Sequence, residues 1–157
     1  MNQTGRDQTA MAFEPIAMVK NDVKEIGRRD WDNVISQLIV RPDLEDALEG
    51  LKDFSHLIVI FWFHLSPAGE SAPHKTHPQM KQNLPLVGVF ATRSPVRPNA
   101  LGMAVVKLQG QVKNVLIVTG LDALNGTPVL DIKPYLPRDS VAKIKVPDWV
   151  NKLHQSE

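Results

Sequence analysis

Seven short segments rich in β-branched and aromatic residues constrain the fold of this 157-residue chain more than any other feature. Such segments, with turn-forming residues between most of them, predict β-strands. The expected strands are Ile16–Lys20, Val34–Val40, His56–His64, Val87–Thr92, Met103–Gln109, Asn114–Gly120 and Pro128–Pro134. Because no long helical pattern separates them, they favour an all-β, mainly antiparallel sheet that closes into a small barrel or folds as a sandwich. A Rossmann layout is not expected.

One short helix is predicted at Asp43–Leu51. Pro42 precedes it, and Asp43 can cap the free amides of its first turn. One face of this helix carries apolar side chains at helical spacing, namely Leu44, Ala47, Leu48 and Leu51. Gly50 and the polar residues that follow are expected to end it.

The segment His56–His64 is apolar on both faces if it is a strand. Alternation places Leu57, Val59, Phe61 and Phe63 on one face and Ile58, Ile60 and Trp62 on the other. A barrel strand buries only its inner face, so a helix, a loop or a partner subunit must cover the outer one. We therefore expect a homodimer.

The chain is expected to hold one domain, a barrel over 13–146, between a polar tail at 1–12 and a C-terminal tail at 147–157. Cysteine is absent, which excludes disulfides and cysteine nucleophiles and suits the reducing cytoplasm. The longest apolar run, Leu57–Phe63, is far shorter than the roughly 20 residues of a membrane helix. Neither a membrane location nor secretion is expected.

Charge is unevenly distributed along the chain, although the formal net charge is only +1. Residues 74–145 contain ten Lys and Arg against three Asp and Glu, whereas residues 1–73 contain seven against twelve. A basic half can face the phosphates of a nucleic acid. Solvation of an ordinary surface would explain the same lysines.

A long loop is predicted at Ser66–Leu86, because this stretch contains four prolines and lacks the periodicity of a strand or helix. Loops of this length are functional or disordered in most compact domains, so it is a candidate lid or recognition loop. Its His74 and His77, even together with His64, do not complete a recognisable ligand set. No metal site is predicted.

Two arginines, Arg93 and Arg97, follow a β-rich run and are separated by proline-stiffened backbone. Fixed guanidinium groups suit a carboxylate, a phosphate or stacking on a base. Surface arginines in a proline-rich turn are an equally good explanation.

Farther along, Asn125-Gly126 can supply the positive φ angles of a tight hairpin turn between two strands. A turn is the simplest explanation of this passage. Several polar side chains nevertheless lie around the same hairpin, namely Asp122, Asp131, Lys133 and Tyr135.

These two passages, Gly88–Gly102 and Leu121–Tyr135, resemble the signature segments of the TsaA-like (TrmO) family, whose studied members include a tRNA adenosine methyltransferase. The resemblance extends to Phe13-Glu-Pro-Ile16 and to Leu51–His64. The similar segments occur in the same order as in the family and cover most of residues 13–137. It implies a small β-barrel that works as a homodimer and binds S-adenosyl-L-methionine outside the Rossmann framework. The cofactor contacts that it implies are His64, Leu65, Arg93, Asp122, Ala123, Leu124 and Asn125.

The family's reaction methylates N6 of threonylcarbamoyladenosine beside the anticodon of tRNA. That nitrogen loses a proton, so a base is useful, and Asp122 and Asp131 are the candidate catalytic residues, with water as an alternative. Arg97, Lys133 and Tyr135 are the candidate substrate contacts. Because transfer from a sulfonium is an in-line displacement, positioning can supply much of the rate.

The chain departs from the family pattern in three respects. It reads Ile26-Gly-Arg-Arg-Asp-Trp31 where many members carry Pro-Arg-Gln, and Asn125 replaces an Asp. The further domain that follows the barrel in some bacterial members is not expected here. Two alternatives to tRNA methylation therefore stay open: a methyltransferase for a small molecule or another substrate, and a non-catalytic S-adenosyl-L-methionine-binding module.

Overall fold

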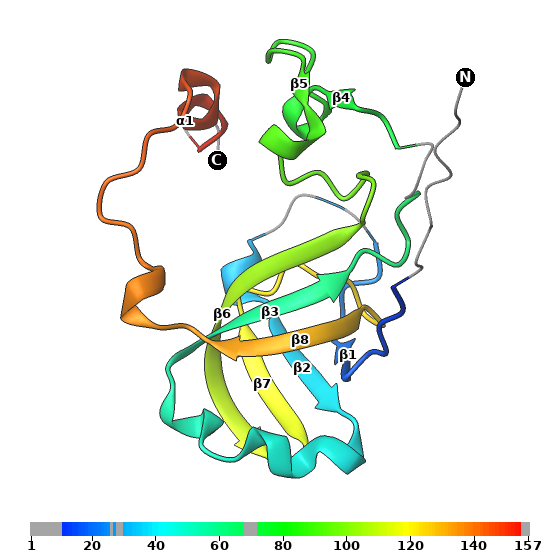
Figure 1. Cartoon of the computed structure of the whole chain (residues 1–157), viewed down its shortest axis with the longest axis vertical. Helices are drawn as coiled ribbons and strands as arrows, with labels where there is room; N and C mark the ends of the chain where they lie inside the picture. Colours follow the sequence, from blue (N-terminus) through cyan, green and yellow to red (C-terminus); the bar gives the residue numbers. More distant parts are fainter. Residues whose placement is uncertain (1–10, 26, 28–29, 68–71, 155–157) are drawn as a thin grey trace, which may run out of the picture.

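A closed barrel of six strands forms the centre of the protein (Figure 1). The computed structural model describes residues 11–25, 27, 30–67 and 72–154. In the order β1-β2-β7-β6-β3-β8, every neighbouring pair is antiparallel. The barrel strands are β1 (Ala17–Lys20), β2 (Ile35–Val40), β3 (His56–Trp62), β6 (Leu101–Val112), β7 (Val115–Thr119) and β8 (Pro128–Pro134). The all-β barrel that the sequence predicts is confirmed.

The core fills the barrel with side chains that alternate along each strand. In β3, Leu57, Val59 and Phe61 are at most 1% exposed, as their alternation predicts. The other strands contribute fully buried residues in the same way, among them Val19, Leu38, Val40, Val106, Leu116, Val118 and Val129. Gly102 in β6 lies opposite Phe61, so the barrel wall has no side chain where the large ring is placed.

The predicted α-helix at Asp43–Leu51 is wrong in type and extent. The chain forms a 3-10 helix, η2 (Pro42–Leu48), and after Gly50, whose φ is +80°, a second one, η3 (Leu51–Asp53). Asp43 does not cap η2, because its carboxylate accepts hydrogen bonds of 3.1 and 2.6 Å from the Arg41 guanidinium. Leu48 is buried in the core, so these two turns close one end of the barrel.

The predicted strand Val87–Thr92 is also largely wrong. Only β5 (Val87–Gly88) forms a strand, and it pairs with β4 (Lys75–Thr76) outside the barrel before the 3-10 turn η5 (Val89–Ala91). β3 and β6 pair along seven successive residues, which leaves no place between them for a further strand. The predicted long loop, Ser66–Leu86, contains β4 and the turn η4 (Pro78–Met80). Its residues 68–71 lie outside the described part of the chain.

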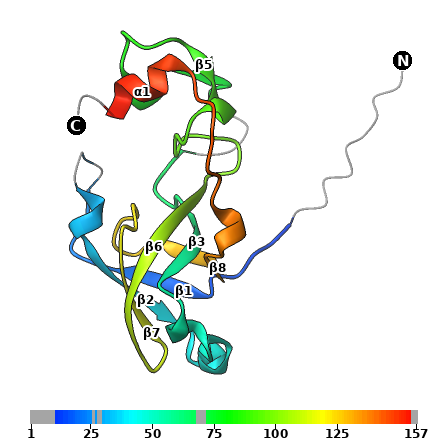
Figure 2. The same ribbon diagram turned by 90° about the vertical axis from the view of Figure 1, so that its left-hand side faces the viewer.

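The predicted C-terminal tail contains a helix, α1 (Asp148–His154), which lies beside the β4–β5 excursion in two perpendicular views (Figures 1 and 2). The remaining turns are η1 (Trp31–Asn33) and η6 (Pro137–Asp139). Most of the predicted N-terminal tail, 1–10, is outside the described residues, as are 155–157. Within the described part, every helix is too short or too polar to cross a bilayer.

The outer face of β3 and β6 is apolar and incompletely covered. Cross-strand neighbours pair there as Ile58 with Val105, Ile60 with Met103 and Trp62 with Leu101. Four of these six side chains, Trp62, Leu101, Met103 and Val105, are 44 to 50% exposed. We call these six residues the outer apolar face.

Candidate functional site

Three segments that are distant in sequence meet at one end of the barrel. The last residue of β3, Trp62, pairs with the first residue of β6, Leu101, and Phe61 pairs with Val129 near the start of β8. The Phe63 amide donates to the Ala100 carbonyl at 2.8 Å. The segment after β3, the loop before β6 and the loop before β8 therefore lie next to one another.

The loop before β6 is braced by its own polar side chains. The Thr92 hydroxyl accepts from the Ser94 amide at 3.2 Å, and Arg97 donates to the carbonyls of Thr92 and Ser94 at 3.3 and 3.5 Å. Arg97 is half-buried by these contacts, whereas Arg93 is exposed. The loop thus presents Arg93 to solvent and uses Arg97 as an internal support.

Arg93 acts electrostatically on Asp122, which lies in the loop before β8. Surrounding protein atoms desolvate the Asp122 carboxyl and raise its pKa, although part of the residue stays exposed to solvent. A backbone hydrogen bond and the positive charge of Arg93 oppose this effect without cancelling it. A carboxylate with a raised pKa is a stronger proton acceptor than an ordinary aspartate.

Asn21, which the sequence did not reveal as important, holds the loop before β8 in place. Its side-chain amide donates to the Ser36 hydroxyl and to the Ala123 carbonyl, both at 2.9 Å. Its backbone amide donates to the Asn125 side chain at 3.1 Å. Asn21 and Asn125 are 104 positions apart, so no local pattern could have indicated this contact.

The predicted tight turn at Asn125-Gly126 is present, with the Thr127 amide donating to the Leu124 carbonyl at 3.1 Å. The predicted hairpin is wrong, because the strands on either side of this turn are not neighbours. β7 lies between β2 and β6, whereas β8 lies between β1 and β3. The chain from 120 to 127 instead crosses the end of the barrel, and Gly126, with φ of +79°, donates its amide to the Val19 carbonyl at 2.7 Å. This crossing brings Asp122 toward Arg93.

The predicted cofactor residues differ in exposure. Leu65 is 62% exposed, His64 and Leu124 are half-buried, and Ala123 is buried with its carbonyl bonded to Asn21. Of the residues 121–125, Asp122 and Asn125 therefore have the most accessible side chains. Exposed polar groups beside partly exposed leucines suit a ligand that has both charged and apolar parts.

Three other predicted residues lie elsewhere. Asp131 and Lys133 form a 2.6 Å ion pair on the outer face of β8. Tyr135 donates its amide to the carbonyl of His56, at the start of β3. A seven-residue strand at about 3.3 Å per residue separates that point from the candidate site by roughly 20 Å. The fold thus groups Arg93 with Asp122 and leaves Tyr135 at the other end of β3.

Comparisons with known proteins show the family of the chain. Residues 27–140 match the sequence model of the tRNA-methyltransferase O N-terminal domain. A probable S-adenosyl-L-methionine-binding protein of Pyrococcus abyssi is 33% identical over 94% of this chain and 80% of its own length. The Escherichia coli tRNA (adenine(37)-N6)-methyltransferase is 38% identical over 82% of this chain and 59% of its own.

Solved structures indicate the same family. TrmO from Pseudomonas aeruginosa superposes with a TM-score of 0.69 at 35% identity, over 87% of this chain and 61% of that one. The chain thus spans about three fifths of the Escherichia coli enzyme and of this structure. The matched segment includes five of the six barrel strands and both site loops. The chain belongs to the family of the tRNA-methyltransferase O N-terminal domain.

Proposed function

We propose that this protein is an S-adenosyl-L-methionine-dependent methyltransferase that acts on N6 of adenosine 37 in tRNA, in its threonylcarbamoyl form. The observation that carries the proposal is the grouping of Arg93 and Asp122 at one end of a barrel of this family. The 38% identity to the Escherichia coli tRNA (adenine(37)-N6)-methyltransferase supports methylation at N6 of adenosine 37 in tRNA.

The chemistry of the residues present fits S-adenosyl-L-methionine. The exposed guanidinium of Arg93 suits the methionine carboxylate. Leu65 and Leu124 offer apolar surface for the adenine, and the backbone of 122–125 offers groups to read its edge. His64 completes the proposed set of contacts. When bound, this cofactor supplies the methyl group as a sulfonium.

Asp122 is the proposed proton acceptor. If the bound cofactor supplies its methyl group to N6, the Asp122 carboxylate or water would accept the N–H proton. The raised pKa of Asp122 favours this transfer. Asp131 is less suited to the role, because its carboxylate is ion-paired with Lys133 on the outer face of the barrel.

The basic half of the chain is the proposed surface for tRNA. Lys133 and Tyr135 remain candidate contacts for a substrate large enough to extend along β3 and β8, whereas the bonds of Arg97 favour a positioning role. Binding through phosphates releases counterions, so affinity for tRNA should fall steeply as salt rises. A methyltransferase for a small molecule should show little such dependence.

We further propose that the protein is a cytoplasmic homodimer. The outer apolar face is a contiguous set of six apolar side chains, four of them exposed to water. Such a surface is best covered by an identical surface of a second copy around a two-fold axis. The cytoplasm is where tRNA is modified, and the absence of cysteine suits that compartment.

The first experiment incubates the purified protein with labelled S-adenosyl-L-methionine and tRNA, with or without the threonylcarbamoyl group, and analyses the nucleosides by mass spectrometry. Methyl on the modified adenosine alone is expected. Cofactor binding without transfer to either tRNA would instead favour another substrate or a non-catalytic binding module, such as the probable S-adenosyl-L-methionine-binding protein of Pyrococcus abyssi.

Arg93→Ala tests the cofactor assignment. It should weaken S-adenosyl-L-methionine binding by about 1 to 3 kcal/mol, measured by calorimetry, because the carboxylate loses a charged partner. Arg138→Ala, at an exposed arginine in η6, is the matched control and should leave the affinity unchanged. Equal affinities of the two variants would remove Arg93 from the site.

A further inference from the structure

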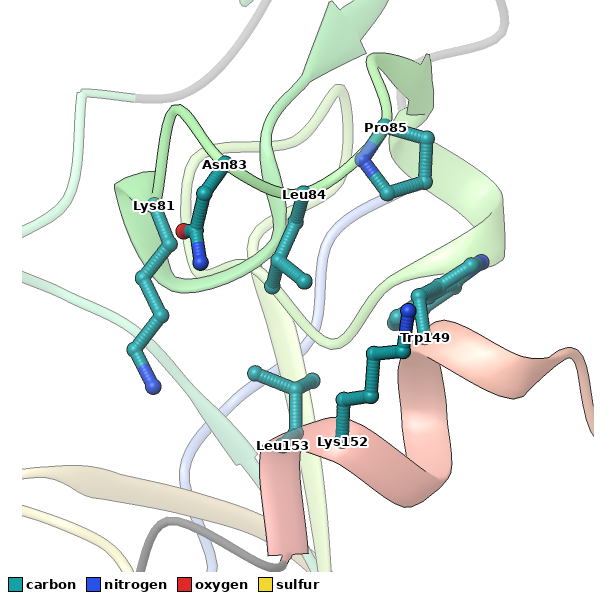
Figure 3. A pocket seen from close by; sticks show the side chains of 7 residues that line it. All are labelled: Lys81, Asn83, Leu84, Pro85, Trp149, Lys152 and Leu153. Atoms are coloured by element: carbon teal, nitrogen blue, oxygen red, sulfur yellow. The ribbon is translucent and has the colours of Figure 1, made fainter.

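A pocket of about 290 Å³ lies between α1 and the loop that follows η4 (Figure 3). Figure 3 shows Trp149 and Leu153 of α1 on one side of the pocket and Leu84 and Pro85 of the loop on the other. Lys81, Asn83 and Lys152 are the polar side chains around it. None of the residues assigned to the cofactor or to proton transfer lines this pocket, and α1 lies beyond the segment 27–140 that matches the family.

One wall of this pocket is a face of α1, and the other is the loop that follows η4. Trp149 and Leu153 are four positions apart, so they share one face of α1, and both are half-buried. On the other wall Leu84 is only 7% exposed. Its amide donates to the Lys81 carbonyl at 3.0 Å, and its carbonyl lies 2.7 Å from Nδ1 of His77. The loop wall is therefore fixed by its own hydrogen bonds.

The lining residues suit a planar apolar group that is attached to an anion. The indole of Trp149 offers a stacking surface and the lysines supply two positive charges, and the lining residues within the described part of the chain include no Asp or Glu. An aromatic platform beside cations is the arrangement with which proteins hold single-stranded nucleic acids. A volume of about 290 Å³ is at the lower end of the range for small-molecule sites, which fits one nucleotide better than a larger ligand.

We infer that this pocket binds one unpaired nucleotide of the tRNA substrate, with its base on Trp149 and its phosphate near Lys81 and Lys152. The inference rests on the proposed function, because it assigns a second contact to the same substrate. Adenosine 37 stands beside the anticodon in a single-stranded loop, so unpaired neighbours are available on either side of it. Proteins recognise RNA loops mostly through such splayed-out bases.

The test measures binding of an unmodified anticodon stem–loop RNA by fluorescence anisotropy and binding of S-adenosyl-L-methionine by calorimetry. Trp149→Ala should weaken RNA binding about tenfold, while Trp149→Phe, which keeps a stacking ring, should stay within about twofold of the wild type. Lys152→Ala should weaken RNA binding and lower the slope of log affinity against log salt by about one. Affinity for S-adenosyl-L-methionine should stay unchanged in all three variants.

Lys52→Ala is the matched control, since this exposed lysine lies in η3 at the end of the barrel that Leu48 closes, and it should leave the RNA affinity and the salt slope unchanged. Lys152 is exposed, so its variant decides the matter even if Trp149→Ala disturbs α1. A wild type that methylates tRNA while Lys152→Ala and Trp149→Ala bind RNA normally would overturn this inference alone. A wild type that neither binds nor methylates tRNA would overturn the proposed function as well.

Discussion

Gly102→Ala should destabilise the barrel, because the Gly102 position is where the wall makes room for the Phe61 ring. A Cβ atom added at Gly102 would lie 2.9 Å from Cδ2 of Phe61 and still closer to Cε2 and Cζ. The ring is 1% exposed and packs edge-to-face on Phe63, with 5.2 Å between the ring centroids. It therefore cannot move away without displacing its neighbours.

The size of the effect follows from overpacking of a closed core. One added methyl group in such a site costs about 1 to 3 kcal/mol of unfolding free energy. For a domain of this length, each kcal/mol lowers Tm by about 2 to 4 °C, so a fall of roughly 2 to 12 °C is expected. Gly110→Ala is the matched control in the same strand, since a Cβ there meets nothing within 4 Å. That variant should be unchanged or slightly more stable.

The assay is chemical denaturation followed by fluorescence or circular dichroism, applied to a double-mutant cycle. Phe61→Leu removes the ring that the new methyl group would strike, so the combined variant should lose less stability than the sum of the two single variants. Gly102→Ala should also weaken S-adenosyl-L-methionine binding, because Phe63, which the ring contacts, begins the segment leading to His64. Strict additivity, or a Gly102→Ala protein as stable as the Gly110→Ala protein, would refute the packing argument.

Three further predictions concern the candidate site and the outer apolar face. Because the pKa of Asp122 is raised in the folded state, the folded protein holds this proton more tightly than the unfolded chain, and the stability of the wild type falls as pH rises from the ordinary aspartate range through the raised pKa. The Tm of Asp122→Asn relative to that of the wild type should therefore rise from about pH 3 to about pH 7. The same Tm difference at both pH values would contradict this prediction. Asn21→Ala should cost about 1 to 3 kcal/mol of stability and weaken cofactor binding, whereas the exposed Asn151→Ala should do neither, as thermal melts and calorimetry would check. Met103→Glu, in the outer apolar face, should give a monomer by light scattering, while Val112→Glu, outside that face, should remain a dimer. Dimers from both variants would exclude the outer apolar face as the interface.

The sequence predicted the strands better than the turns. Alternation in β3 places the buried residues on one face correctly, because burial on one side of a pleated strand repeats every second residue. The same reasoning was wrong for Val87–Thr92, whose β-branched composition suits a strand but whose partner in the fold is the two-residue β4. Composition records local preference, whereas strand pairing depends on which edges the rest of the barrel leaves open.

The candidate site was predicted in part. The resemblance indicated Arg93 and Asp122, and the fold brings them close enough for their charges to interact. It did not indicate Asn21, whose side chain supports the Asp122 loop, nor the internal role of Arg97. Both depend on hydrogen bonds whose partners are fixed only when the loops are folded.

By itself, the sequence determined the fold class, the core positions of the barrel strands and, through its signature segments, the family, since all of these are carried by local periodicity or by contiguous motifs. Only the tertiary structure decided that the 120–127 segment crosses the barrel end, that Asp131 is ion-paired with Lys133, and that α1 lies against the loop of Leu84. The physical reason is that these contacts join residues far apart in sequence. Their geometry follows from the closure of six strands around one core, which no short segment encodes.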